Sequence, residues 1–523
     1  MRVNSIFEEI KNPRLSRILL FGGAIISILW SIYFALVTIA TPYQIEFREG
    51  TALVLTKILL SRGNPFTFEN QPLGMNNYGL GYNLAVLPFA YLFGNTLTVH
   101  RSVTFIFILL LAWIMVWALY RTRRDLPLAL ICAAFAMTGI MAQGSIGAFP
   151  SAMGAFLFMA AILLPALRSF DTPSLVLSVF LSLLAFYTKA YFVLSFGIVA
   201  SYLWLSVSLK KMLTYVFLFL LSFITSLYIV SLIFPLYFIN TIIGNISNTT
   251  RSTVHLLSQF KQLALYFYPI LMVTVIILLA DIWKKEKPSS PRDTKLSLNF
   301  KKWDQPLWNG PLNYFFFAFI TALLAFTLIL GSHIGSYLNY AYQILVPTFF
   351  CWFFQIVDFS NTKRWPLALI LLLNLFAWQS IALNPNMLKQ KDSKEWARMM
   401  SYMQDSSNIL NSPPLTSAVV ELGLNPLDSG QTIYFYSVAP YADNALLGPS
   451  YSAFKADGAI YSANINRSIE KKNFDLVLTV KEKASFYRVR LLYENYSLID
   501  EIVVDMPQTN QTWTVLIWQP KGE

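Results

Sequence analysis

The sequence has little charge and few residues of the kinds that form covalent or metal-ion sites. Its 523 residues include two cysteines and three histidines, and only 13% of the residues are charged. The cysteines, Cys132 and Cys351, both lie inside apolar runs, so neither disulfides nor a cysteine metal site is indicated. A soluble protein would carry about 25% charged residues, and the composition therefore excludes an ordinary soluble enzyme.

Long apolar stretches are the main feature that is present. Hydrophobic residues make up 56% of the chain, and repeated runs approach the roughly 20 residues that cross a bilayer. We therefore predict a mainly α, polytopic membrane protein of about 11 transmembrane helices. The expected spans are 17–40, 101–120, 126–142, 149–167, 174–187, 190–208, 212–235, 263–282, 312–331, 338–357 and 365–383.

The positions of lysine and arginine predict how these helices are oriented. A further apolar stretch, 79–94, is expected to lie flat on the outer surface. With that placement, nineteen basic residues fall on the cytoplasmic side, and seven fall outside before the C-terminal tail. Because cytoplasmic loops are enriched in these residues, we expect a multi-pass protein of the cell (inner) membrane with its N-terminus in the cytoplasm. The net charge of +12 then implies no nucleic-acid partner.

Two segments of the expected outer face are longer than simple connections. The first, 41–100, is typical of two short surface helices with a turn-rich stretch between them, and structured long loops are often functional. The second, 384–523, is more polar. Its expected elements are helices near 392–409 and 461–472 and strands near 432–437, 475–480 and 513–518. We therefore predict a membrane domain, 1–383, with a catalytic outer loop, and a small extracytoplasmic α/β domain, 384–523.

The stretch YQIEFREG, residues 43–50, places two carboxylates at the start of the outer loop. Glu46 and Glu49 are three residues apart, so they share a face if a helix begins here. Carboxylates at a helix start can serve only to satisfy backbone N–H groups. The alternative is that one of them acts as a general base beside the low-dielectric edge of the membrane.

Cationic and imidazole side chains gather on the same expected face. Lys189 lies between two apolar helices, where a charge is costly and often marks a binding site, and Arg101 opens the second span. His333, Arg251 and His255 fall in other outer loops. Each alone is compatible with a snorkelling or satisfied polar residue. Together they suit the phosphate of a lipid-linked molecule.

Aromatic residues, among them Tyr78, Tyr82 and Tyr340, accompany these polar positions. Tyrosines of this kind form the ordinary interfacial belt of membrane proteins, and they are also compatible with stacking on sugar rings. The outer segments contain no glycine-rich phosphate loop, no H-E-x-x-H sequence and no Asp-x-Asp pair. Neither a metal nor another cofactor is therefore expected.

The order of several short motifs resembles the GT-C superfamily of polyprenyl-phosphate-dependent membrane glycosyltransferases. The similarity is greatest to the protein O-mannosyltransferase and lipid A aminoarabinose transferase relatives. The matching features are Arg48-Glu49 in place of the usual Asp-Glu, a surface helix closing at Gly63, NQPLGMNNYG, AYLFG at 90–94, Arg101, Thr188-Lys189 and GSHIGSYLNY at 331–340. They cover most of the membrane part, although each motif is short.

The resemblance implies a glycosyltransferase that moves a hexose or pentose from a polyprenyl-phosphate donor to a lipid, glycan or protein acceptor. Transfer would invert the anomeric carbon, occur at the extracytoplasmic face and need no metal. Glu49 or Glu46 would be catalytic, and the donor phosphate would bind Lys189, Arg101 and His333. The expected substrate-binding residues are Arg48, Asn77, Tyr78, Tyr82, Arg251, His255 and Tyr340. Because Arg48 stands where an acid is expected, both glutamates stay candidates, and the spacing to Gly63 favours Glu49.

Two other classes of protein are considered. A transporter or flippase of lipid-linked saccharides would be expected to show repeated halves and charges at mid-membrane. No internal repeat is evident here, and the polar residues gather at one face. A structural or sensor protein with a ligand-binding tail would need far fewer spans than this sequence predicts.

Overall fold

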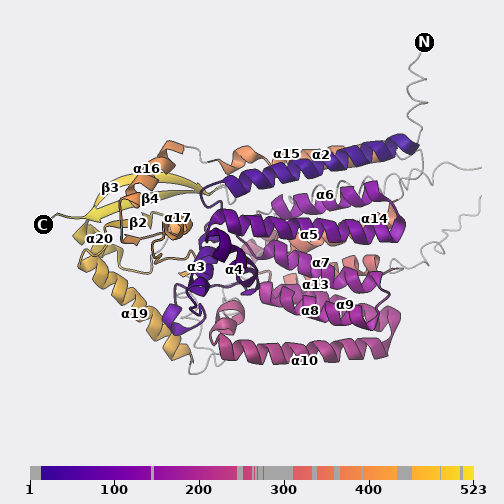
Figure 1. The fold of residues 1–523 in the computed structure, drawn as a ribbon, viewed down its shortest axis with the longest axis horizontal. Coiled ribbons are helices and arrows are strands. Elements are labelled where there is room, and N and C mark those ends of the chain that lie inside the picture. The colour runs from indigo at the N-terminus through magenta and orange to yellow at the C-terminus, as the bar shows by residue number, and fades with distance from the viewer. Residues whose placement is uncertain are drawn as a thin grey trace, which may run out of the picture.

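The computed structural model describes most of the chain. The described residues are 13–142, 146–243, 251–261, 310–332, 339–357, 365–389, 393–432, 450–482, 485–506 and 511–522, with the isolated positions 264, 268, 272 and 275. They form a bundle of helices with a small sheet at one end, and α3 and α4 lie at the junction (Figure 1).

The bundle helices follow the apolar runs. They are α2 (Pro13–Ala40), α5 (Leu97–Arg123), α6 (Leu126–Ala142), α7 (Ser151–Leu167), α8 (Thr172–Thr188), α9 (Leu194–Tyr202), α10 (Leu209–Ile233), α13 (Pro311–Leu330), α14 (Asn339–Ile356) and α15 (Trp365–Ala382). In Figure 1, α2 and α15 lie on one side of the bundle and α10 lies on the opposite side.

Within the described residues, five helical stretches are long and apolar enough to cross a membrane, and shorter apolar helices accompany them. The five are Arg17–Ala40, Leu97–Arg123, Ala190–Val207, Leu209–Ile233 and Pro366–Leu388. The prediction of a mainly α membrane protein is confirmed. The expected span 263–282 lies outside the described residues apart from isolated positions, so the total number of spans stays a prediction.

Small residues allow α6 and α7 to lie at the centre of the bundle. Nearly every residue from Leu128 to Met141 is buried. A Cβ atom at Gly139 would lie 2.9 Å from the Val346 side chain of α14, and one at Gly154 would overlap the ring of Phe192. Glycine and alanine at these positions let the helix axes approach closely. This packing fixes the start of α7, where a residue of the candidate site lies.

The outer loop contains the two short helices that the sequence predicts. They are α3 (Glu49–Leu60) and α4 (Gly81–Phe93), and the stretch between them includes the short helix η1 (Phe68–Asn70). α4 ends at Gly94, whose φ of +89° favours glycine. Both helices are confirmed, whereas their placement on the outer membrane surface stays a prediction.

The C-terminal sheet has the strand order β1-β2-β4-β3. Its strands are β1 (Ile409–Leu410), β2 (Leu476–Val480), β3 (Tyr496–Met506) and β4 (Gln511–Pro520). β1 pairs parallel with β2, and the other pairings are antiparallel. Successive residues of β2 enter two apolar clusters: Leu476 and Leu478 pack with Met399 and Met403, and Val477 packs on the other face. The central strand is therefore buried on both faces.

Within the described residues, four helices accompany this sheet: α16 (Ser393–Gln404), α17 (Thr416–Glu421), α19 (Ser450–Glu470) and α20 (Val489–Asn495). Most of the elements that the sequence predicts in this region are present. The helices expected near 392–409 and 461–472 correspond to α16 and α19, and the strands near 475–480 and 513–518 correspond to β2 and β4. The strand expected near 432–437 lies outside the described residues apart from Thr432. The division of the chain into domains at 384 stays a prediction.

Candidate active site

Glu49 and Arg101 form a fully buried ion pair between the start of α3 and the start of α5. The Arg101 Nε and Nη2 atoms donate to the two carboxylate oxygens of Glu49 over 2.9 and 2.8 Å. The other three N–H groups of Arg101 donate to the carbonyls of Thr38, Thr41 and Tyr43. A guanidinium has five N–H donors, so every one of them has an acceptor here.

The Glu49 carboxylate is equally saturated. Besides the two bonds from Arg101, it accepts the backbone N–H groups of Ile45 over 2.7 Å and of Ala148 over 2.9 Å. A carboxylate offers about four acceptor positions. The Glu49–Arg101 pair therefore joins the end of α2, the outer loop and the segment before α7, and the lone pairs of Glu49 are used in doing so.

Glu46 has different surroundings. Its side chain is 1% exposed, and its two oxygens accept the Nε–H and the backbone N–H of Arg48, each over 2.6 Å. Among the described residues, Arg48 supplies both of these bonds, so about two acceptor positions of the carboxylate are not used by them. Burial raises the pKa of the Glu46 carboxyl, and the charge and hydrogen bonds of Arg48 oppose that rise.

Arg48 extends from this carboxylate towards Tyr78. Its side chain is 21% exposed, Nη1 donates to the Tyr78 hydroxyl over 2.7 Å, and the guanidinium lies 5.6 Å from the centre of the Phe149 ring. Contacts of this kind fix the plane of a guanidinium. Arg48 is thus held at the edge of the loop rather than directed into solvent.

Lys189 reaches the same tyrosine from the bundle. It lies between α8 and the short helix η2 (Ala190–Val193) and is 6% exposed. Its Nζ atom donates to the Ser151 hydroxyl over 2.9 Å and lies 4.5 Å from the centre of the Tyr78 ring. Burial lowers the pKa of Lys189 to about 7, with a further contribution from Arg48 that Glu46 opposes. Tyr78 therefore contacts both cations, one at its hydroxyl and one at its ring.

The structure brings together part of the predicted set. Glu46, Arg48, Tyr78 and Lys189 form one cluster, and Glu49 and Arg101 lie behind it in the buried pair. Which of them act on a substrate stays a prediction.

The other predicted residues lie elsewhere or are not fully described. Asn77 donates its backbone N–H to Gln431 over 3.0 Å. Tyr82 is buried, and its hydroxyl donates to the His100 carbonyl over 3.0 Å. Arg251 is exposed, and His255 donates its backbone N–H to Ser252. His333 lies outside the described residues, and so does the side chain of Tyr340.

Sequence reasoning missed Ser151 and Phe149. Ser151 is the first residue of α7 and follows Pro150, and a proline often marks the start of a helix. That signal could have placed a hydroxyl at the start of this helix. Phe149 carried no signal of its own, because aromatic residues are abundant throughout the chain.

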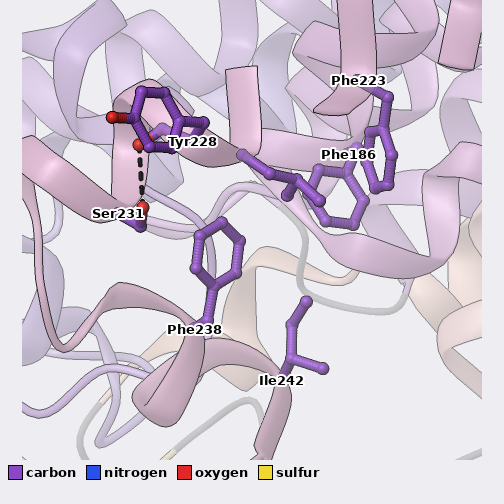
Figure 2. A pocket seen from close by; sticks show the side chains of 7 residues that line it. Phe186, Phe223, Tyr228, Ser231, Phe238 and Ile242 are labelled. Carbon is purple, nitrogen blue, oxygen red and sulfur yellow. Dashed lines mark hydrogen bonds between the residues drawn. The ribbon is translucent and has the colours of Figure 1, made fainter. Parts of the chain in front are cut away.

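An apolar pocket of about 470 Å³ lies near the C-terminal end of α8, the end that Lys189 follows. Phe186 of α8 and Phe223 of α10 lie together on one side of it, with Phe238 and Ile242 nearby (Figure 2). Phe186 is only three residues before Lys189 in the chain. Gly79, next to Tyr78, donates its N–H to the Thr188 carbonyl over 3.1 Å. The pocket and the cluster that contains Tyr78 and Lys189 therefore both contact residues at the C-terminal end of α8.

The bundle, the loop that carries α3 and α4, and the C-terminal sheet together form a fold that is shared with solved structures. The chain is similar to ArnT from Cupriavidus metallidurans. The crystal structure of ArnT bound to undecaprenyl phosphate matches with a TM-score of 0.57 and 9% identity, over 95% of this chain and 98% of that chain. The apo structure of ArnT matches with a TM-score of 0.56 and 10% identity, over 95% and 97%.

The likeness is in structure rather than in sequence. No protein-family model matches this chain, and no curated protein matches it significantly. At these identities the likeness shows the fold alone.

Proposed function

We propose that the protein is a membrane glycosyltransferase that uses a polyprenyl-phosphate sugar as its donor. The observation that carries this proposal is the convergence of Arg48 and Lys189 on Tyr78, beside the carboxylate of Glu46. An arginine and a lysine that contact the same tyrosine favour an anionic ligand. The adjacent apolar pocket suits a prenyl chain, and the ArnT structure with undecaprenyl phosphate supports this class of donor.

In this proposal, Arg48 and Lys189 bind the donor phosphate. As the bond between the anomeric carbon and the phosphate oxygen breaks, negative charge builds up on the leaving phosphate. Cations already oriented by surrounding contacts stabilise such charge with little reorganisation. A planar guanidinium is also suited to bind two phosphate oxygens at once.

Glu46 is proposed to act on the acceptor. It would orient the acceptor hydroxyl for attack on the anomeric carbon and take its proton, and a single displacement would invert that carbon. If the acceptor group is itself a phosphate, no proton needs to be removed and Glu46 would only position it. The proposal needs no metal. The proposed acceptor is a lipid, a glycan or a protein, and the proposed sugar is a hexose or a pentose.

Glu49 and Arg101 receive a different role from the one expected from the sequence. All five N–H groups of Arg101 and about four acceptor positions of Glu49 are already used in internal hydrogen bonds. Binding a phosphate or a substrate hydroxyl would require breaking them. We therefore assign this pair to holding the outer loop in place.

The site is proposed to face the extracytoplasmic side of the cell membrane, with the N-terminus in the cytoplasm. The excess of lysine and arginine in the expected cytoplasmic segments supports this orientation.

Binding of undecaprenyl phosphate to the purified protein tests the phosphate site. Arg48→Ala and Lys189→Met are each expected to weaken the dissociation constant by about 10- to 100-fold, because a hydrogen bond to a charged group contributes about 1.5–3 kcal/mol. The dissociation constant can be measured by titration of tryptophan fluorescence in detergent.

The control is Lys210→Met, which removes an exposed lysine at the start of α10. That residue lies roughly 20 Å along the helix from the pocket-lining Phe223, and its removal is expected to leave binding unchanged. Wild-type affinity in both Arg48→Ala and Lys189→Met would refute the proposed phosphate site.

A further inference from the structure

A turn of the C-terminal part, Asp428–Gln431, lies directly against the loop that carries Glu46 and Arg48. The Thr51 hydroxyl donates to the Ser429 carbonyl over 2.7 Å, and Gln431 accepts the N–H of Asn77, next to Tyr78. Between these two contacts, Gly430 faces the Phe47 carbonyl so closely that a Cβ atom at position 430 would lie 2.6 Å from its oxygen.

The turn is fixed from within the C-terminal part. The Asn411 carboxamide accepts the N–H groups of Leu427 and Asp428 and donates to the Asp428 carbonyl. The Asp428 carboxylate accepts the N–H of Gly430 over 2.8 Å. Gly430 itself has φ of +90°, a conformation that favours glycine. The turn is therefore a rigid surface against which the loop rests.

The contact at Phe47 acts directly on the Glu46–Arg48 pair. The Phe47 carbonyl and the Arg48 N–H belong to one planar peptide unit, and this N–H donates to the Glu46 carboxylate over 2.6 Å. Any rotation of the Phe47 carbonyl therefore rotates the N–H that holds Glu46. The start of the Arg48 side chain moves with the same unit.

A second contact from the C-terminal part holds the same carbonyl. The Gln44 side chain donates to the Phe47 carbonyl over 3.0 Å and to the Pro413 carbonyl over 3.2 Å, and it accepts the Ser417 N–H over 2.7 Å. The Phe47 carbonyl is thus held by Gln44 and bounded by Gly430. Both residues depend on the C-terminal part for their positions.

We propose that Gly430 is a positioning residue of the active site. The turn that it forms sets the orientation of the Phe47–Arg48 peptide, and through that peptide it sets the Glu46 carboxylate and the Arg48 guanidinium. This inference rests on the proposed function, because it requires that Arg48 bind a phosphate. It assigns the C-terminal part a direct share in building the site.

A pair of glycine substitutions tests the inference. Gly430→Ala and Gly423→Ala both place alanine at a positive φ, +90° and +79°, but a Cβ atom at 423 would meet nothing within 4 Å. The two variants therefore share a similar backbone strain, and only Gly430→Ala pushes on the Phe47 carbonyl. We expect Gly430→Ala to weaken the dissociation constant of undecaprenyl phosphate about tenfold, and Gly423→Ala to bind like the wild type.

A double-mutant cycle with Arg48→Ala separates positioning from general destabilisation. Because Gly430 acts through Arg48, the double variant is expected to bind no more weakly than Arg48→Ala alone. Independent, additive losses would overturn the inference. So would wild-type binding by Gly430→Ala when Arg48→Ala binds weakly, and that result would leave the proposed function standing. Wild-type binding by Arg48→Ala would instead refute the proposed phosphate site.

Should Gly430→Ala not fold, Thr51→Val provides the second variant. It removes the hydrogen bond to the Ser429 carbonyl with little change of shape. The same non-additivity with Arg48→Ala is expected, with a loss of about threefold to tenfold. Additive losses, or binding as tight as in the wild type, would overturn the inference here too.

Discussion

At the scale of single residues, Glu46 and Glu49 differ in how many hydrogen bonds they accept. Glu49 accepts four, two of them from a guanidinium with no exposed surface. Within the described part of the chain, the Glu46 carboxylate accepts two, both from Arg48, whose side chain is 21% exposed. Such a difference separates a carboxylate whose acceptor positions are all used from one that can still accept a hydrogen bond from a substrate hydroxyl.

The first prediction concerns stability. Glu49→Gln replaces a carboxylate oxygen by an NH₂ group that faces other donors, and leaves Arg101 buried without its charge partner. We expect a loss of about 3–5 kcal/mol in the free energy of unfolding, which is typical when one partner of a buried ion pair is removed. Glu46→Gln is expected to cost much less, and thermal unfolding in detergent measures both.

The control for this comparison is Glu494→Gln. Glu494 pairs with Arg490 on the exposed surface of α20, and such pairs contribute about 0–1 kcal/mol. Equal melting temperatures for Glu49→Gln and Glu494→Gln would contradict the structural role assigned to Glu49.

The sequence identified Glu46 and Glu49 as candidate catalytic residues but could not show which of them is structural. Its preference for Glu49 rested on spacing and resemblance. The groups that saturate the Glu49–Arg101 pair are mostly backbone carbonyls and N–H groups, such as those of Thr38, Thr41 and Ala148. Backbone groups leave no side-chain pattern in a sequence, so their convergence becomes visible only in three dimensions.

At the scale of elements, the end of α8 and the C-terminal half of α10 define the apolar pocket. α8 supplies Phe186, and α10 supplies Phe223, Leu227, Tyr228 and Ser231. If this pocket receives the prenyl chain of the donor, its side chains should affect long-chain ligands more than short ones.

The resulting prediction uses chain length as the readout. Phe223→Ala and Phe238→Ala are each expected to weaken binding of undecaprenyl phosphate by about tenfold, since each removes part of a contact worth about 1.5–3 kcal/mol. Binding of geranyl phosphate should change little. The control is Phe217→Ala, which removes an exposed phenylalanine of α10 that does not line the pocket. Equal effects on both ligands would place the prenyl chain elsewhere.

Helices were predicted well from the sequence because apolar runs reveal them directly. α6 begins and ends where its run does, at residues 126 and 142. β3 was missed because its pairing with β4 shifts between Leu498 and Asp500, and this irregularity breaks the alternation that marks a strand. β1 was missed because it has only two residues.

At the scale of the whole molecule, the site is built from parts of the chain that lie far apart. The Thr51–Ser429 bond joins positions 378 residues apart, and Gln44 reaches Ser417 across 373 residues. The sequence predicted a polar C-terminal region on the outer side but gave no sign of what it would contact. Contacts of this kind depend on the complete fold, so the positioning role of the C-terminal part could not be predicted.

The measurement that tests the central claim most directly is sugar transfer. Membranes containing the wild-type protein or Glu46→Gln are supplied with a panel of labelled undecaprenyl-phosphate-linked hexoses and pentoses, and release of undecaprenyl phosphate is compared with label transferred to an acceptor. For one donor we predict equal amounts of both products, with the rate lowered by about 10²- to 10⁴-fold in Glu46→Gln, as expected on loss of a general base. Turnover of none of these donors by the wild type, or transfer by Glu46→Gln at the wild-type rate, would contradict the account.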